Sequence, residues 1–252
     1  MAERFTDGRV PDAGVRALFA RQHRWQCWLD VEAALAVAEA ECGVIPAAAA
    51  QAIESAARLA GLDVARIERG IGETSHPLMA LVTELAIAAG EHGGWVHWGA
   101  TTQNITQTGD VLVLREAHQV ILRLLARILS AAADLAERTA GALAAGRTHG
   151  QHAVPITFGF KPAGWIDELV RHVTRLRSAE GRVFTAMTGG AAGTFASLGQ
   201  AGPRVQDAVA TRLGLRRWRC RPGRSPTASP STCACSACSA RPGHASPARS
   251  IS

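Results

Sequence analysis

The chain has 252 residues, of which 47% are hydrophobic and 19% charged, so it can build a folded core, and extensive disorder, collagen-like repeats and disulfide scaffolds are excluded. Aromatic residues make up only 5% and tyrosine is absent, which favours helices over a sandwich or barrel. The net charge of +6 arises in residues 216–252, which hold seven arginines and no acidic residue, so the rest of the chain is nearly neutral and does not indicate a nucleic-acid-binding surface.

The first part of the sequence predicts helices of moderate length. Over residues 15–42, apolar positions recur at intervals of three and four, and a glycine and a proline then end the helix. Two shorter helices are expected over about residues 47–59 and 77–89. Residues 91–107 are rich in glycine, threonine and histidine and predict a loop.

The second part predicts two long helices. The first covers about residues 110–140, with apolar residues at a spacing close to the 3.5-residue repeat of bundles. These residues are Leu114, Ala117, Ile121, Leu125, Ile128, Ala132 and Leu135. A polar loop over 146–158 leads to the second long helix, which has Pro162 in its first turn. A glycine-rich loop over 187–199 and a short helix over 203–213 follow.

These elements predict an all-α fold. We expect an N-terminal helical domain over residues 1–105 and part of a central long-helix bundle over 106–215, with the chemistry carried by loops at the bundle ends. Residues 216–252 lack periodicity and predict a disordered tail. If residues 233–240 are written in GC-rich codons and read from the third base, they become Arg-Leu-Leu-Gly-Leu-Leu-Gly. This hidden frame has the apolar content of a helix, so we also hypothesise that the tail results from a shifted reading frame.

Cysteines and apolar runs suggest the cellular setting. Cys27 and Cys42 lie 15 residues apart in a helical pattern and are expected to be reduced, buried thiols. Three tail cysteines and His244 have a spacing that fits no standard zinc site, so we expect no metal and no cofactor. With no run of 18 apolar residues and no leader-like segment, the sequence favours a soluble, cytoplasmic protein without a membrane partner. The tail lacks aromatic interleaving, so nucleic-acid binding is not expected.

Three segments concentrate hydroxyl, amide and imidazole groups at predicted helix ends. They are Glu-Thr-Ser-His-Pro at 73–77, His-Trp-Gly-Ala-Thr-Thr-Gln-Asn at 97–104, and Gly-Arg-Thr-His-Gly-Gln-His-Ala at 146–153. Threonine hydroxyls, glutamine amides and helix N-terminal N–H groups donate to carboxylate oxygens without adding a competing titration. His149 has the side chain to move a proton near neutral pH.

Four motifs in this order resemble the fumarase/aspartase superfamily. They are Trp-Leu-Asp-Val-Glu-Ala-Ala-Leu at 28–35, His-Trp-Gly-Ala-Thr-Thr-Gln at 97–103, Arg-Thr-His-Gly-Gln at 147–151 and Gly-Gly-Ala-Ala-Gly-Thr at 189–194. The resemblance covers about residues 12–215. It is greatest to the branch that holds adenylosuccinate lyase, an enzyme of purine metabolism, and 3-carboxy-cis,cis-muconate cycloisomerase.

The resemblance implies a homotetramer whose active sites combine loops of three subunits. It also implies a reversible anti elimination that releases fumarate, in which the carbanion is held as an aci-carboxylate. By likeness, the residues expected to bind substrate carboxylates are Thr101, Thr102, Gln103, Thr148 and Gln151. His149 would be the general acid, and His76 a helper near the leaving group.

The branch features conflict. His149 favours an adenylosuccinate-lyase-like enzyme, because the cycloisomerase usually lacks this histidine, whereas residues 97–101 and 190–194 look more like the cycloisomerase. Asn104 stands where the family usually has aspartate. The family's mobile Gly-Ser-Ser-x-Met-Pro-x-Lys-x-Asn loop, which supplies the base, is not found in the sequence. We therefore expect a C-terminally truncated subunit that is inactive by itself.

Simpler interpretations stay open for several residues. His76, Thr74 or Ser75 could cap a helix, His97 and His152 could serve loop packing, and the glycine run at 189–193 could be a tight turn. The chain could also be a non-catalytic helical oligomerisation module with a basic tail. In either case the incomplete bundle would expose the seam of Ile121, Leu125, Ile128 and Leu169, so we expect aggregation or heterogeneous oligomers.

Overall fold

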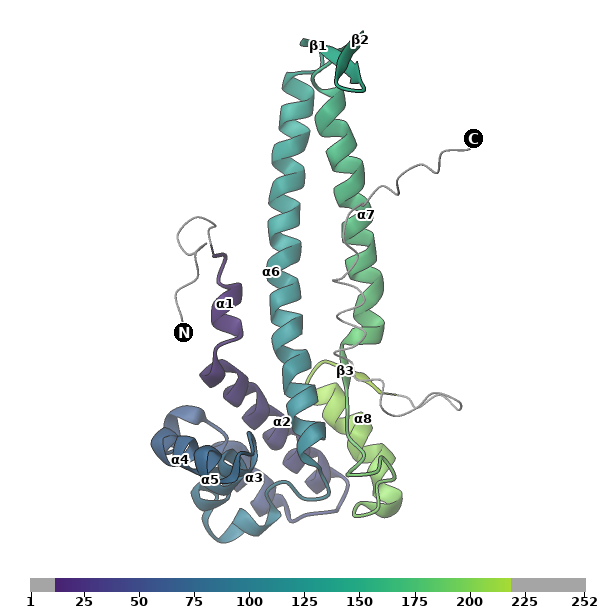
Figure 1. Cartoon of the computed structure of the whole chain (residues 1–252). Coiled ribbons are helices and arrows are strands. Elements are labelled where there is room, and N and C mark those ends of the chain that lie inside the picture. The colour runs from purple at the N-terminus through teal and green to yellow at the C-terminus, as the bar shows by residue number, and fades with distance from the viewer. Residues whose placement is uncertain (1–11, 219–252) are drawn as a thin grey trace, which may run out of the picture.

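The computed structural model describes residues 12–218, which form a helical base and a long two-helix arm (Figure 1). The helices are α1 (Val15–Leu18), α2 (Arg21–Glu41), α3 (Ala47–Ala56), α4 (Val64–Thr74), α5 (Met79–Ala88), α6 (Thr102–Arg138), α7 (Phe160–Val183) and α8 (Gly202–Arg212). Single 3-10 turns cover η1 (Leu59–Gly61), η2 (Gly90–Trp95) and η3 (Gly199–Ala201). The all-α prediction is confirmed, apart from a hairpin, β1 (Leu143–Thr148) with β2 (Gln151–Thr157), and a two-residue pair, β3 (Thr185–Ala186) with β4 (Arg216–Arg217).

Helix α2 is the centre of the base. It packs against α3, α6 and α8, and its buried residues face more than one side of the helix, including Leu29, Val31 and Ala38. Apolar residues of α3, α4 and α5 complete the core, among them Ile53 and Ile67. Burial of this continuous apolar surface is the main favourable contribution to folding of the base.

The first predicted helix is interrupted, and one helix was missed. Ala20 has extended backbone angles, which separate α1 from α2 within the predicted range of 15–42. Helix α4 was not predicted, although Asp63 is an N-cap whose side chain accepts from the backbone N–H of Arg66 at 2.9 Å. An aspartate before an amphipathic stretch is a recognised helix-start signal, so this helix could have been found.

Helix α6 begins eight residues before its predicted start at 110, so the predicted loop over 91–107 is wrong at its C-terminal end. Residues 102–107 of that predicted loop, with two of its threonines, lie inside the helix, whereas its three glycines at 93, 94 and 99 precede it. Gly109 is needed inside the helix, because a Cβ at this position would lie 2.3 Å from Cδ1 of Trp28 in α2. Close packing of α2 on α6 therefore explains a glycine that costs helix propensity.

The predicted polar loop over 146–158 is instead an antiparallel hairpin. His149 and Gly150 form its two-residue turn with φ of 48° and 74°, which is the positive-φ pattern of a type I′ turn. Thr148 pairs with Gln151 directly beside the turn. His-Gly is a much weaker turn signal than Asn-Gly, which explains why the hairpin was not predicted.

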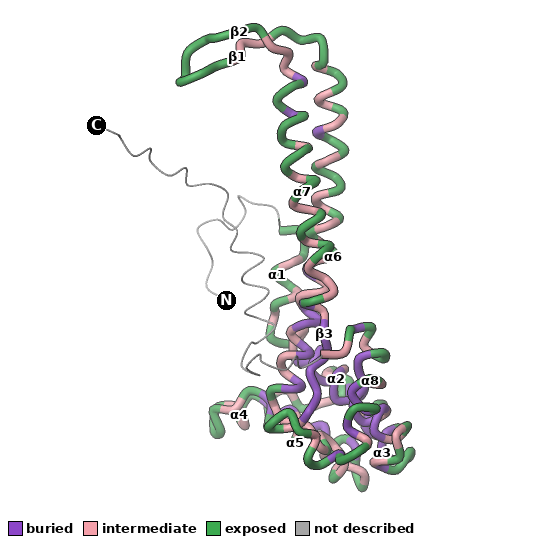
Figure 2. The backbone as a smooth tube through the Cα atoms, turned by 90° about the vertical axis from the view of Figure 1, so that its right-hand side faces the viewer, coloured by how far each residue is buried: buried purple, intermediate pink, exposed green. Residues whose placement is uncertain are grey.

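Helices α6 and α7 leave the base together and carry the hairpin at their far end (Figure 1). Burial is concentrated in the base, whereas the arm is mostly exposed or half-buried (Figure 2). Ile121 and Ile128 of the predicted seam are exposed, as are Trp165 and Val170 on α7. Within residues 12–218, no helix combines the length and apolarity needed to cross a bilayer.

The described part continues three residues past the predicted domain boundary at 215. Arg216 and Arg217 form β4, which pairs in parallel with Thr185 and Ala186. The rest of the tail predicted over 216–252, residues 219–252, lies outside the described residues. Cys27 and Cys42 form no disulfide, as predicted, but only Cys27 is buried, whereas Cys42 at the end of α2 is half-buried. Burial raises the pKa of Cys27 to about 12.

Candidate active site

One polar cluster lies at the N-terminal end of α6. Thr101 is the N-cap residue, and it forms a capping box with Asn104, whose Oδ1 accepts from the backbone N–H of Thr101 at 3.2 Å. Thr102 and Gln103 occupy the first helical turn, where backbone N–H groups lack intrahelical acceptors. Thr101 and Thr102 are half-buried and Gln103 is exposed. Hydroxyl, amide and helix-terminal N–H donors thus share one place, which suits an anion.

His76 reaches this cluster from the turn between α4 and α5. Its Nδ1 accepts from the backbone N–H groups of Met79, at 3.1 Å, and Leu78, at 3.4 Å, so the ring caps α5. In the neutral ring the proton is therefore on Nε2, which lies 3.5 Å from Oγ1 of Thr102. His76 combines the two roles considered for it, because one nitrogen caps a helix while the other faces the predicted carboxylate-binding residues.

The glycine-rich segment at 187–199 packs against the same end of α6. Oδ1 of buried Asn104 accepts from the N–H of Gly190 at 3.0 Å, and the hydroxyl of Thr108 bonds both the N–H and the carbonyl of Met187. Gly190 and Gly193 have φ near 74° and close a tight turn between their own backbone groups. The tight-turn interpretation of this segment is confirmed. The role of Asn104 as the link between the two segments was missed, although Thr-x-x-Asn resembles a capping box.

His97 serves the packing of this loop, as the simpler interpretation predicted. Its Nδ1 lies 2.6 Å from Oε1 of Glu32, a carboxyl group of α2 that is only 1% exposed. Burial by itself would lower the pKa of His97, but the hydrogen bond to Glu32 and its charge outweigh this effect and raise the pKa. The pair anchors the 97–104 segment to the centre of the base.

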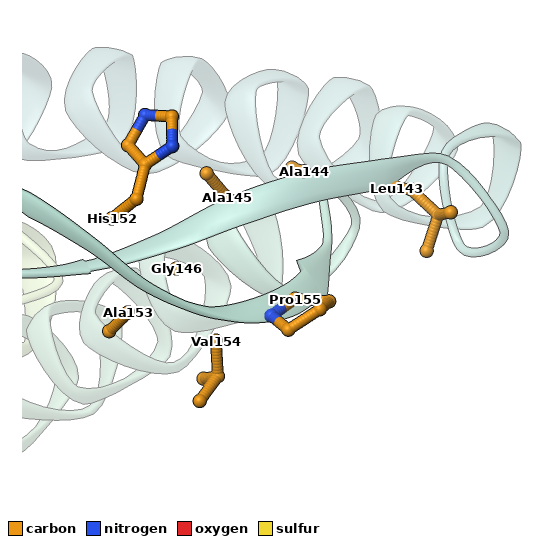
Figure 3. Close-up of a pocket in the computed structure, with 8 residues that line it drawn as sticks. All are labelled: Leu143, Ala144, Ala145, Gly146, His152, Ala153, Val154 and Pro155. Carbon is orange, nitrogen blue, oxygen red and sulfur yellow. The ribbon is translucent and has the colours of Figure 1, made fainter.

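The second cluster lies at the tip of the arm. Thr148, His149 and Gln151 surround the hairpin turn and are all exposed. On the same hairpin, Nε2 of His152 lies 3.3 Å from a guanidinium nitrogen of Arg147. The hairpin has a shallow hollow lined by Leu143–Gly146 and His152–Pro155, with His152 and Val154 projecting to different sides of the ribbon (Figure 3). The hollow includes His152 but none of the predicted substrate-binding residues.

Helix α6 keeps the two clusters apart. It contains 37 residues and is therefore about 55 Å long, with Thr102 at its first residue and the hairpin beyond its last (Figure 1). His76 joins Thr101, Thr102 and Gln103, whereas Thr148, His149 and Gln151 are grouped separately. Within one copy of the chain, these groups cannot act on one small molecule.

Comparison with known proteins connects both clusters to one family. The family described as "Lyase" matches residues 9–228. The chain is 40% identical over 201 residues to the N-acetyl-S-(2-succino)cysteine lyase of Dickeya dadantii, which covers 80% of the chain and 44% of that protein. It is 38% identical over 216 residues to the adenylosuccinate lyase of Pyrococcus horikoshii, which covers 86% of the chain and 48% of that protein.

A solved structure has the same arrangement of helices. The 3-carboxy-cis,cis-muconate lactonizing enzyme from Pseudomonas putida superimposes with a TM-score of 0.81 at 34% identity, over 86% of this chain and 50% of that one. The chain thus spans about half the length of the relatives that it matches. These relatives differ in the substrates that their names state, and their identities to this chain are similar.

Proposed function

Since the chain belongs to the lyase family of the fumarase/aspartase superfamily, we propose that it supplies the carboxylate-binding and acid groups of an adenylosuccinate-lyase-like β-elimination. In the proposed reaction, a C–H bond and a C–N bond of a succinyl-substituted amine break and fumarate forms. The proton lost from carbon goes to a base, and the departing nitrogen takes a proton from His149. Thr101, Thr102 and Gln103 donate to the substrate carboxylate that gains charge in the transition state.

The observation that carries this proposal is the geometry around Thr102. Its hydroxyl lies at a helix N-terminus and faces Nε2 of His76, which donates because Nδ1 is occupied by two backbone N–H groups. The Thr102 hydroxyl, the side-chain amide of Gln103 and Nε2–H of His76 can each donate a hydrogen bond, and no carboxylate is among them, so the place suits a carboxylate better than a cation. His76 is thus proposed as a donor near the leaving group rather than as a base.

The second cluster completes the site only from another copy of the chain. Thr148, His149 and Gln151 lie about 55 Å along α6 from Thr102, so a complete set of donors needs the hairpin of a second subunit beside the first cluster. The exposed Ile121, Ile128 and Trp165 of the arm offer an apolar face for that association. We therefore propose a homo-oligomer, with the tetramer as the expected state.

The leaving group is the least determined part of the proposal. His149 and the similarity to an adenylosuccinate lyase favour a nitrogen leaving group, and the similarity to an N-acetyl-S-(2-succino)cysteine lyase favours sulfur. A cycloisomerase-like activity is the alternative, favoured by the solved structure of similar fold and by the 97–101 segment. All of these substrates carry the carboxylates that the first cluster would hold.

The test measures binding and turnover separately. The chain is titrated with fumarate by calorimetry, and fumarate release is followed with adenylosuccinate and with N-acetyl-S-(2-succino)cysteine. Thr102→Val and His149→Gln are each expected to weaken fumarate binding by roughly 10–100-fold. Thr102→Val removes a hydrogen bond to a carboxylate oxygen, and His149→Gln removes the imidazole proposed to lie beside the bound molecule. Thr83→Val, at an exposed position of α5, and His172→Gln, at a half-buried position of α7, are the matched controls and should bind as the original chain does.

Association is tested by the same titration. A double variant that carries Ile121→Gln and Ile128→Gln should sediment as a monomer. It should also bind fumarate more weakly than the original chain. Fumarate binding that Thr102→Val does not affect would overturn the proposed site. Tight binding by a proven monomer would overturn the shared site. Fumarate binding without release from either substrate is the result expected if this chain is inactive by itself, and fumarate release would overturn that expectation.

A further inference from the structure

A cluster of three metal-ligating side chains lies away from the candidate active site, between α2 and α6. His23 and Cys27 are four residues apart on α2, so they lie on the same face of the helix. Glu116 reaches them from α6. Nε2 of His23 lies 2.9 Å from a carboxylate oxygen of Glu116 and 3.8 Å from Sγ of Cys27, and all three ligand atoms lie within 4.8 Å of one another.

The donor types and spacing match those of a tetrahedral zinc site. Imidazole nitrogen, thiolate sulfur and carboxylate oxygen are the three protein donors that Zn²⁺ uses. Bond lengths of about 2.0–2.3 Å place tetrahedral ligand atoms about 3.3–3.8 Å apart. The distance from His23 to Cys27 lies at the upper end of this range, and the distance from His23 to Glu116 is about 0.4 Å below it, so small side-chain rotations would suffice.

Access and charge also favour a cation. Cys27 is only 3% exposed, but the side chains of His23 and Glu116 are 34% and 42% exposed, so an ion can enter from their side. Asp30 and Asp110 add negative charge near Cys27, while Arg115 adds positive charge and Arg24 pairs with Asp110 at 2.9 Å. A bound cation would displace the thiol proton, as happens in other thiolate sites.

We propose that His23, Cys27 and Glu116 form a binding site for a divalent transition-metal ion, with zinc as the ion that this donor set favours. The ion would join α2 to α6 and so fix the arm on the base. Glu116 lies 14 residues along α6 from Thr102, about 21 Å away, so this site is separate from the candidate active site. Among residues 12–218, no other group of three such side chains meets the same geometry.

Cobalt is the probe for the test, because a Co²⁺–thiolate bond gives a charge-transfer band in the near ultraviolet. The full chain is used with Cys220, Cys233, Cys235 and Cys238 replaced by serine, so that thiols of residues 219–252 do not contribute. One equivalent of Co²⁺ should produce the band, and Zn²⁺ should displace it. Zinc at about 100 times its Kd should raise the Tm by roughly 5–10 °C.

Variants assign the ligands. Cys27→Ser should abolish the cobalt band, and His23→Gln and Glu116→Gln, at partly exposed positions, should each weaken cobalt binding at least about tenfold. Cys42→Ser is the matched control and should keep the band and the zinc-dependent rise in Tm. Absence of the band, its persistence in Cys27→Ser, or unchanged binding in both His23→Gln and Glu116→Gln would overturn the proposal. Circular dichroism of each variant separates a lost ligand from a lost fold.

Discussion

The base and the arm of this molecule are both helical but differ in what covers their helices. In the base, α2 is surrounded by α3, α6 and α8, and residues such as Leu29 and Ile53 are fully buried. In the arm, α6 and α7 pack mainly on each other, and Ile121 and Ile128 are exposed. The helical pattern alone therefore does not tell whether an apolar residue meets its partner within the same chain.

The two clusters of polar residues differ in the same way, because one is held by contacts within the base and the other lies at the exposed end of the arm. The cluster around Thr102 is positioned by contacts inside the base, through Asn104, His76 and the glycine-rich segment. The cluster around His149 lies at the turn of the two-stranded hairpin, where Thr148, His149 and Gln151 are all exposed. Under the proposed function, the two clusters would form one site only where the hairpin of a second copy lies beside Thr102.

The largest expected effect compares a core residue with an arm residue. Leu29→Ala removes a fully buried side chain at the centre of the base and should lower the free energy of unfolding by about 2–5 kcal/mol. Ile128→Ala shortens a side chain that is 51% exposed and should lower the free energy of unfolding by about 0.5–1 kcal/mol at most. Urea unfolding at low protein concentration measures both.

A large loss of unfolding free energy in Ile128→Ala would show that this side chain of the arm is covered in solution. If that loss grows with protein concentration, the covering surface is another copy of the chain. If it is independent of concentration, Ile128 is covered within its own chain.

The next effect concerns a carboxyl group buried in the base. Glu39 of α2 is fully buried, neither of its oxygens has a hydrogen-bond partner, and burial together with nearby Glu32 raises its pKa from 4.5 to about 8. Between pH 4.5 and 8 the folded chain therefore binds more protons than the unfolded chain. Stability should fall as the pH rises through this interval, by an amount on the order of a few kcal/mol, and then level off.

Glu39→Gln should remove this dependence. The variant should match the original chain near pH 4.5 and exceed it in stability at pH 8, because glutamine has no proton to lose. Glu54→Gln, at an exposed position of α3, is the control and should keep the original pH profile. Urea unfolding across this pH range distinguishes the two, and parallel profiles for Glu39→Gln and the original chain would refute the assignment to Glu39.

The sequence predicted the features that depend on local pattern. The long helices, Pro162 in the first turn of α7 and the short α8 follow from apolar spacing and helix-end signals, and all are confirmed within a few residues except at the start of α6. That start was missed because the Gly, Thr and His content of residues 91–107 predicted a loop, and the close packing of Gly109 in α6 on Trp28 in α2 cannot be seen in the sequence. Such a glycine is explained only by contact between distant segments.

The site shows the same limit. The types of residue at Thr101, Thr102 and Gln103 indicated an anion-binding segment, and a resemblance to a family gave them roles that remain predictions. Sequence spacing alone places His23 and Cys27 on one face of α2, but Glu116 joins them only through the packing of α6. The division of the polar residues between the two ends of α6 likewise required the hairpin, which the sequence did not predict.

The smallest expected effect tests how the base positions its polar cluster. Oδ1 of Asn104 accepts from the N–H groups of both Thr101 and Gly190, so Asn104→Ala leaves two donors without this acceptor and should cost about 1–2 kcal/mol. Asn104→Asp retains the acceptor and adds negative charge at a helix N-terminus, so it should cost less than alanine or stabilise the chain slightly. Thermal unfolding and hydrogen exchange at Gly190 measure the two variants. If aspartate were as destabilising as alanine, the side-chain amide would be essential, and the two accepted hydrogen bonds would not explain how α6 holds the glycine-rich segment.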